Sequence, residues 1–145
     1  MAAAASWLLW GAILVGCASG GGPVTGGEAY GAVSPEAAVH AFLDAAKISD
    51  YRGMARYFGT KDGPAVKKLG TQEVEQRMLV LSRLLRHTGY ALRPSGFTET
   101  GNRVRFLVSI AGTRNGNVTV PFVTVPSHGR WFVEQIVTDA LTGRR

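Results

Sequence analysis

The stretch RVRFLVSIAGTRNGNVTVPFVTV, residues 103–125, decides the fold class. Apolar side chains occupy every second position before its centre, namely Val104, Phe106, Val108 and Ile110. This period of two is typical of a β-strand with one buried face. Asn115-Gly116 follows, the dipeptide that most favours a two-residue type I′ hairpin turn. The sequence therefore predicts two antiparallel strands joined at Asn115-Gly116.

A turn at this position also predicts the register of the hairpin. It places Ile110 opposite Pro121 and Val108 opposite Val123, so the face of Val108 continues through Val123 and Val125. The other face then gathers a second apolar set: Leu107, Ala111, Val120 and Phe122. Apolar residues on both faces predict a strongly curved sheet or a subunit contact. Because proline has no N–H to donate, Pro121 predicts a bulge or a sheet edge.

Two more strands are expected, one on each side of the hairpin. Tyr90–Phe97 is the first strand, interrupted by Pro94, and Arg130–Val137 is the last, entered through a turn at His128-Gly129. Residues 138–145 are expected to form a frayed tail.

Helical patterns precede these strands. Ser34-Pro35-Glu36 combines an N-cap, a proline at the first helical position and an acid in the first turn. Asp50 is expected to cap a second, short helix, and Thr71 to cap a third over about Gln72 to His87. The first helix has a buried stripe of Val39, Phe42, Leu43 and Ala46. The third has a wide apolar stripe, expected to be buried against the sheet: Val74, Met78, Leu79, Val80, Leu81, Leu84 and Leu85. Residues 59–70 between the second and third helices are predicted to be a turn.

These elements predict one α+β domain over residues 34–137, with three N-terminal helices packed on a curved four-stranded antiparallel sheet. The segment SPEAAVHAFLDAAKISDYRGMARYF (34–58) resembles the opening of nuclear-transport-factor-2-like domains, which share the cystatin-like cone fold. GRWFVEQIV (129–137) is similar to their closing strand. Enzymes of this family, such as ketosteroid isomerase, use a tyrosine on the first helix and two carboxyl groups in the cone cavity. The matching first-helix position here is Phe42, and FGTKDGPAVKKLG (58–70) does not match the acid-bearing strand, so the resemblance does not imply isomerase chemistry.

The N-terminal segment predicts a lipid anchor. Residues 7–15 form an uncharged apolar block, and Leu14-Val15-Gly16-Cys17 resembles the lipobox of bacterial lipoproteins, whose cysteine accepts the acyl chains. Residues 1–16 are then a signal peptide, and residues 17–33 a lipidated cysteine with a glycine-rich flexible linker. An ordinary core cysteine and an uncleaved signal anchor are the alternatives. Ala18 is not the aspartate associated with inner-membrane retention, which favours the periplasmic side of the outer membrane if the host has two membranes.

Glu134 is the one candidate for a catalytic or ligand-binding carboxylate. A turn at His128-Gly129 places it beside Val123 on an apolar face, where burial would raise its pKa and suit it to act as a general base. A one-residue change of register, or an ion pair with Arg103 or Arg105, is the structural alternative. Tyr57 or Tyr51 could add to the polar lining of a cavity.

Composition excludes several other functions. The net charge of the 145-residue chain is +6, but its basic residues are scattered and form no nucleic-acid motif. His40, His87 and His128 are dispersed, so neither a metal site nor a cofactor is predicted. His40 and Asp44 lie four residues apart on a polar helix face, where a solvated pair is expected rather than a catalytic dyad.

Two functions remain open. The sequence favours a lipid-anchored cell-envelope protein with a non-catalytic domain that binds an unknown envelope protein or small ligand. The alternative is a small-molecule-binding protein or enzyme that uses the cone cavity, with Glu134 as its polar or general-base group. A homodimer through the sheet is compatible with either reading.

Overall fold

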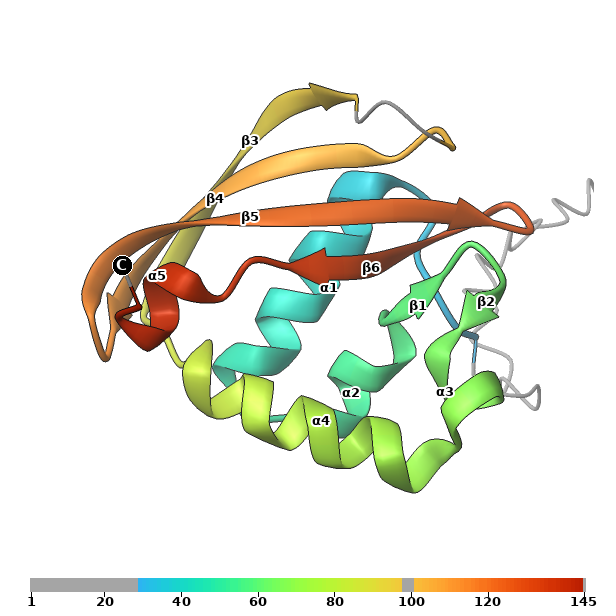
Figure 1. Ribbon diagram of the computed structural model, residues 1–145, viewed down its shortest axis with the longest axis horizontal. Coiled ribbons are helices and arrows are strands. Elements are labelled where there is room, and N and C mark those ends of the chain that lie inside the picture. The colour runs from blue at the N-terminus through green and yellow to red at the C-terminus, as the bar shows by residue number, and fades with distance from the viewer. Residues whose placement is uncertain (1–28, 98–100, 145) are drawn as a thin grey trace, which may run out of the picture.

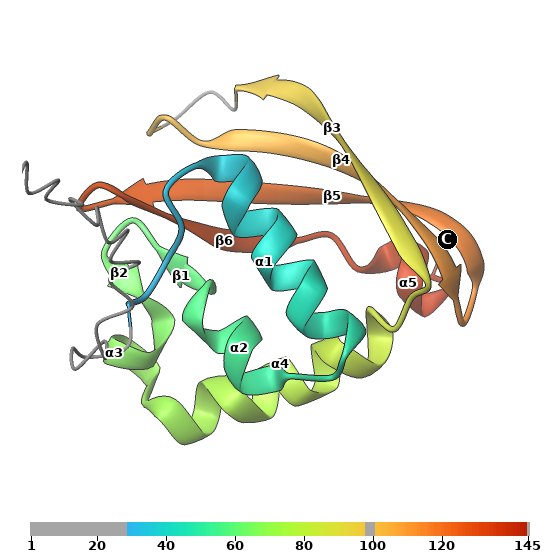
Figure 2. The same cartoon turned by 180° about the vertical axis from the view of Figure 1, so that it is seen from behind.

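A computed structural model describes residues 29–97 and 101–144. It is an α+β fold in which a curved four-stranded antiparallel sheet covers α1, with α4 on the far side of α1 and α2 (Figures 1 and 2). The sheet is a meander in the order β3-β4-β5-β6. In chain order the elements are α1 (Pro35–Lys47), α2 (Tyr51–Arg56), β1 (Gly59–Thr60), β2 (Gly63–Pro64), α3 (Ala65–Leu69), α4 (Thr71–Leu84), β3 (Gly89–Phe97), β4 (Val104–Thr113), β5 (Gly116–Ser127), β6 (Arg130–Ile136) and α5 (Asp139–Thr142).

The starts of α1 and α2 agree with the sequence prediction. The Ser34 hydroxyl accepts a hydrogen bond from the Ala37 N–H at 3.1 Å. An Asp50 carboxylate oxygen accepts one from the Gly53 N–H at 2.9 Å. Each bond satisfies one of the N–H groups that a helix start leaves without an intrahelical partner.

Residues 59–70 are more structured than the predicted turn. They contain the small β1–β2 hairpin and the short helix α3, so four helices rather than three lie between residue 29 and the large sheet. Gly63 has a φ of +116°, which glycine adopts without strain. The Ala65 N–H then donates to the Phe58 carbonyl at 3.0 Å.

The prediction for α4 is wrong in two respects. Thr71 is the first helical residue rather than the cap; Gly70 is the N-cap and forms no side-chain capping bond. Leu79 and Val80 are 37% and 58% exposed, because α4 packs on α1 and α2 rather than against the sheet (Figure 1). A helix packed on other helices buries a narrower stripe than one packed flat on a sheet.

The hairpin of β4 and β5 forms, but in a different register from the predicted one. Ile110 pairs with Val118 and Val108 with Val120, so Phe122 lies on the core face, opposite to the face predicted. A type I′ turn at Asn115-Gly116 requires a positive φ at both residues, yet only Gly116 has one, at +81°. The two-residue turn is instead Arg114-Asn115, and a bulge between Ile110 and Thr113 shifts the register again. The different turn and the bulge together displace the pairing of β5 with β4 by three residues. Because side chains alternate between the two faces of a strand, an odd displacement moves each β5 side chain to the opposite face.

The other local strand signals are confirmed. His128 and Gly129 have φ values of +50° and +75°, as a type I′ turn needs, and they join Ser127 to Arg130. β3 has a bulge between Pro94 and Gly96.

Pro121 pairs with Leu107 of β4 without a bulge, and on its other side it lies at the end of the ladder between β5 and β6. It is one residue before the first pair of β5 with β6, Phe122 with Ile136. The Pro121 carbonyl accepts from the Val137 N–H at 3.0 Å, and the Pro121 nitrogen faces the same side but cannot donate the reciprocal bond, so the ladder ends here.

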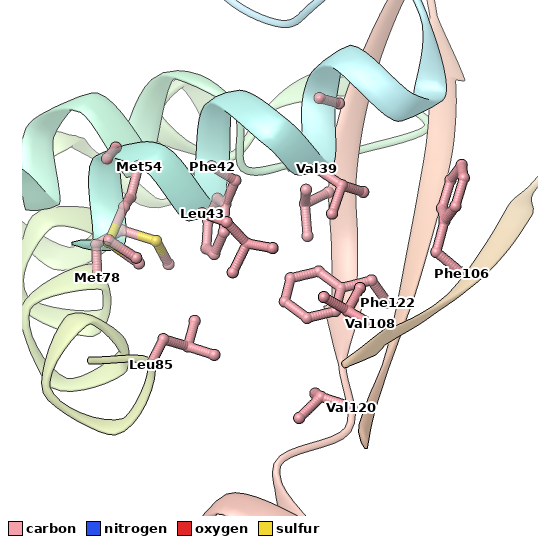
Figure 3. Close-up of a cluster of buried hydrophobic side chains, with 14 of the residues drawn as sticks. Val39, Phe42, Leu43, Met54, Met78, Leu85, Phe106, Val108, Val120 and Phe122 are labelled. Atoms are coloured by element: carbon pink, nitrogen blue, oxygen red, sulfur yellow. The ribbon is translucent and has the colours of Figure 1, made fainter. Parts of the chain in front are cut away.

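Three phenylalanines fill the space between α1 and the sheet. Phe42, Phe106 and Phe122 are fully buried, and Figure 3 shows Val39 and Phe42 of α1 directed towards the strands. The rings of Phe42 and Phe122 meet edge to face with 6.3 Å between centroids. The interior of the domain is therefore a packed core.

Both ends of the described chain join the fold. Ala32 forms an antiparallel bridge with Trp131, and Phe58 a parallel one with Val133, so two segments cover the free edge of β6. The folded domain thus begins a few residues before the predicted boundary at residue 34. At the other end, the predicted frayed tail contains α5, whose Leu141 is buried. The Asn115 side-chain amide donates to the Leu141 carbonyl at 2.7 Å, which attaches α5 to the β4–β5 turn.

Candidate functional site

Glu134 forms an ion pair with Arg103. It is the extra residue of a bulge in β6, between Val133, which pairs with Thr124, and Gln135, which pairs with Val123. The predicted position beside Val123 is therefore wrong by one residue. The carboxylate accepts from Arg103 Nε at 2.5 Å and from Arg103 Nη2 at 2.9 Å.

This ion pair satisfies Glu134 rather than leaving it available as a base. The two side chains are 24% and 21% exposed, and they link β6 to the residue that precedes β4. The hydrogen bond and the charge of Glu134 raise the pKa of Arg103. The alternative reading of the sequence, an ion pair with Arg103, is thus confirmed. The bidentate geometry fixes the relative orientation of the two side chains.

The two tyrosines considered as cavity lining lie elsewhere. Tyr57 and Tyr51 are both partly buried against the core. The Tyr57 carbonyl accepts from the Val133 N–H at 2.7 Å, and the Tyr51 ring lies 5.9 Å from the Arg52 guanidinium. Within the described ranges, the hollows named below are lined by neither of them, nor by Glu134.

The structure brings together four polar residues that the sequence does not connect. Tyr90, at the start of β3, reaches α1, where its hydroxyl lies 2.7 Å from Asp44 Oδ1 and 2.9 Å from His40 Nδ1. The rings of His40 and His87 both lie 5.5 Å from the Tyr90 ring. Two of the three histidines predicted to be dispersed therefore contact one tyrosine, and His40 and Asp44 share a partner instead of forming a solvated pair.

The direction of each bond follows from the proton count. The Tyr90 hydroxyl has one proton, and the charged carboxylate of Asp44 is its stronger acceptor. His40 Nδ1 must then donate to the Tyr90 oxygen. Burial, followed by the hydrogen bond and charge of Asp44, raises the pKa of Tyr90 well above its ordinary value of 10.0. Tyr90 is thus held as a neutral hydrogen-bond donor, a role that suits linking β3 to α1 better than proton abstraction.

His87 is the fourth member of this cluster and contacts the Tyr90 ring edge to face. It is 6% exposed, and its Nδ1 lies 2.6 Å from the Leu85 carbonyl, which can only accept, so Nδ1 carries a proton. Its Nε2 is buried without a hydrogen-bond partner among the described residues. No local pattern in the sequence predicts the cluster, because Tyr90 is 46 residues from Asp44 and 50 from His40.

Replacing Tyr90 by phenylalanine should destabilise the domain by about 1 kcal/mol, the cost of one partly exposed hydrogen bond to a charged group. Chemical denaturation at pH 7 measures this difference. Because the pKa of Tyr90 is raised by folding, the stabilisation should be complete below about pH 10 and decline as the pH rises further.

Tyr57→Phe provides the matched control, since no hydrogen bond to the Tyr57 hydroxyl is found in residues 29–97 and 101–144. It should change the free energy of unfolding by less than about 0.5 kcal/mol. Equal losses in the two variants would show that the Tyr90 hydroxyl forms no specific link.

Surface hollows lie at both ends of the domain. At the end where the described chain begins, a hollow of about 360 Å³ has a mixed lining: Tyr30, Asp62, Gly63, Pro64, Lys67, Ser127, His128, Arg130 and Phe132. Nearby, a hollow of about 310 Å³ is bordered by Asp50, Arg52, Arg56 and Glu75, among others. At the opposite end, a hollow of about 470 Å³ is lined by Arg83, Arg86, Gly112, Thr113 and Arg114. Only this last lining combines several cations with no acid.

The predicted lipidation site, Cys17, lies outside the described residues. Within residues 29–97 and 101–144, none of the helices has the length and apolar character to cross a membrane.

Comparisons with known proteins identify no function. No family model matches the sequence, and no curated protein matches it. Among solved structures, the chain is similar to an NTF2-like protein of unknown function from Cytophaga hutchinsonii. The identity is 10% and the TM-score 0.41, over 76% of this chain and 96% of the other.

Proposed function

We propose that this protein is a lipid-anchored component of the bacterial cell envelope whose folded domain, a nuclear-transport-factor-2-like cone, binds a partner or ligand without catalysis. The fold assignment is supported by the order of the elements, in which capped helices precede a curved four-stranded meander. The anchor is supported by the Leu14-Val15-Gly16-Cys17 sequence.

The packed interior is the observation that carries the non-catalytic part of the proposal. Phe42, Phe106 and Phe122 occupy the space between α1 and the sheet that a cone enzyme would keep open for substrate. Glu134, the one acid considered for catalysis, is held by Arg103. Recognition would then take place on the outer surface of the domain.

The position of the first described residues supports a tether at the end of the domain that contains the β5–β6 turn. Arg130 Nη2 donates to the Gly31 carbonyl at 2.7 Å and Arg130 Nε to the Tyr30 carbonyl at 3.3 Å. These bonds fix the first described residues beside the β5–β6 turn and the β1–β2 hairpin (Figure 2). Residues 17–28 would connect this end to the bilayer. In a host with two membranes, the periplasmic side of the outer membrane is the proposed location.

Substituting Cys17 by serine should abolish the anchor, because a hydroxyl cannot form the thioether that holds the diacylglyceryl group. In a bacterial host that processes lipoproteins, incorporation of labelled palmitate should fall to background, and the processed form should leave the membrane fraction. Ala18→Ser is the control, since it makes a similar small polar change one residue later and keeps the thiol. Labelling that persists in Cys17→Ser, or is lost equally in both variants, would contradict the anchor.

A further inference from the structure

Three arginines converge on one hollow between the end of α4 and the β4–β5 turn. Arg83 and Arg86 come from the last turn of α4 and the residues after it, and Arg114 comes from the turn. The hollow, of about 470 Å³, falls within the range of small-ligand sites. Gly112 and Thr113 complete the lining. Because Arg86 and Arg114 are 28 positions apart, the sequence alone does not reveal the group.

These three cations are not neutralised by protein acids. Arg52, Arg77 and Arg103 each form an ion pair with a glutamate. In the described part of the chain, no carboxylate forms an ion pair with Arg83, Arg86 or Arg114, and all three side chains are exposed. Three like charges around one hollow repel one another, and an anion placed between them would relieve that repulsion.

The partial negative charge at the C-terminus of α4 is too small to neutralise the three arginines. A helix C-terminus carries about half a negative charge, which favours nearby arginines and disfavours an anion. Three guanidinium groups exceed that partial charge by about 2.5 units. The excess matches an anion with two or more charges rather than a single carboxylate.

The turn that holds Arg114 is fixed by its own hydrogen bonds. Thr113 Oγ1 donates to the Gly116 carbonyl at 2.6 Å and accepts from the Asn115 N–H at 3.2 Å. The Gly112 N–H donates to Asn117 Oδ1 at 3.2 Å. The backbone of the site is thus ordered before any ligand arrives, which lowers the entropy cost of binding.

We propose that this hollow binds a small, multiply charged oxyanion of the phosphate class. The planar fork of each guanidinium can donate two hydrogen bonds to phosphate oxygens, and three forks suit a group with several charged oxygens. Figure 1 shows the end of α4 and the β4–β5 turn, whose residues line the hollow, beside α5 and away from the end where the described chain begins. A tethered domain would thus present it to solutes rather than to its own membrane. This inference rests on the proposed binding role of the domain, but not on the lipid anchor.

Binding of inorganic pyrophosphate to the full chain in a non-ionic detergent tests the site, by calorimetric titration at constant ionic strength. The Arg83→Gln, Arg86→Gln, Arg114→Gln triple variant should bind about 1,000-fold more weakly or beyond detection, because each of the three charged hydrogen-bonding groups contributes about a factor of ten. The control is Lys61→Gln, Lys67→Gln, Lys68→Gln, which removes three exposed charges elsewhere. It should change the affinity less than about threefold, since screening weakens distant charges.

Arg114→Lys adds a test of geometry, because it keeps the charge and loses the fork. It should weaken binding while leaving the circular dichroism spectrum and melting temperature unchanged. Absence of pyrophosphate binding by the unmodified chain, or equal losses in the two triple variants, would overturn the proposal. Competition with a soluble short-chain phosphatidylglycerol distinguishes the two possible sources of the phosphate group. Displacement of pyrophosphate would assign the site to lipid head groups, and no displacement would assign it to free phosphate compounds. Retained membrane anchoring with no pyrophosphate binding would refute this site alone.

Discussion

Replacing Phe122 by alanine should lower the free energy of unfolding by about 4 kcal/mol, the largest effect we expect from a single side chain. Phe122 is fully buried, pairs with Phe106 across β4 and β5, and meets Phe42 edge to face. Its removal would leave a cavity that α1 and the sheet cannot close without losing other contacts. Because small domains are stable by only about 5–15 kcal/mol, much of the margin would be lost. Urea denaturation followed by circular dichroism measures the change.

Leu107→Ala is the matched control and also tests the register. The register read from the sequence places Leu107 and Phe122 on the same face of the sheet, whereas the structure places them on opposite faces. Leu107 is only partly buried, so its replacement should cost less than about 1.5 kcal/mol. Similar losses in the two variants would favour the register read from the sequence over that of the structure.

The features that the sequence predicted correctly depend on residues close together in the chain. The Ser34 and Asp50 caps, the alternation in β4 and the His128-Gly129 turn each involve interactions within a few residues. In such cases the backbone requirement and the side chain that meets it lie in the same segment.

The predicted register of the β4–β5 hairpin is wrong because Asn115-Gly116 is compatible with two kinds of turn. Asn115-Gly116 suits a type I′ turn, but a glycine with positive φ directly after a two-residue turn also closes a hairpin with a bulge. The docking of α5 on Asn115 favours the second kind of turn. That contact joins residues 26 positions apart and is invisible in the local pattern.

The candidate sites depend still more on distant parts of the chain. The sequence singles out Glu134 and includes its partner Arg103 among the alternatives, because Glu134 lies in a predicted strand and Arg103 directly precedes another. The Tyr90 cluster and the arginine hollow join helices to strands. Their geometry depends on how α1 and α4 pack, and for α4 the apolar pattern was misleading.

Gly59→Ala is expected to be the second most damaging substitution, at about 3 kcal/mol. A methyl group at Gly59 would lie 2.6 Å from the Gly63 carbonyl oxygen and 2.8 Å from two atoms of the Phe132 ring. Phe132 is 2% exposed and the carbonyl belongs to the β1–β2 hairpin, so neither can move without disturbing its neighbours. Overpacking of this kind usually lowers the free energy of unfolding by about 1–3 kcal/mol. We expect a value near the upper end of that range, because one of the contacts is with the backbone. Thermal and urea denaturation measure the loss.

Gly89→Ala isolates the steric cause of that loss. Gly89 also lies in a strand, but a methyl group there meets no atom within 4 Å. This replacement should be neutral, or stabilising by about 0.5 kcal/mol, because alanine restricts the unfolded chain. Because Gly59 belongs to β1, whereas the arginine hollow is lined by residues at the end of α4 and around the β4–β5 turn, the folded fraction of Gly59→Ala should retain its affinity for pyrophosphate. A stability as high as that of Gly89→Ala would mean that β1 does not pack against Phe132 as described.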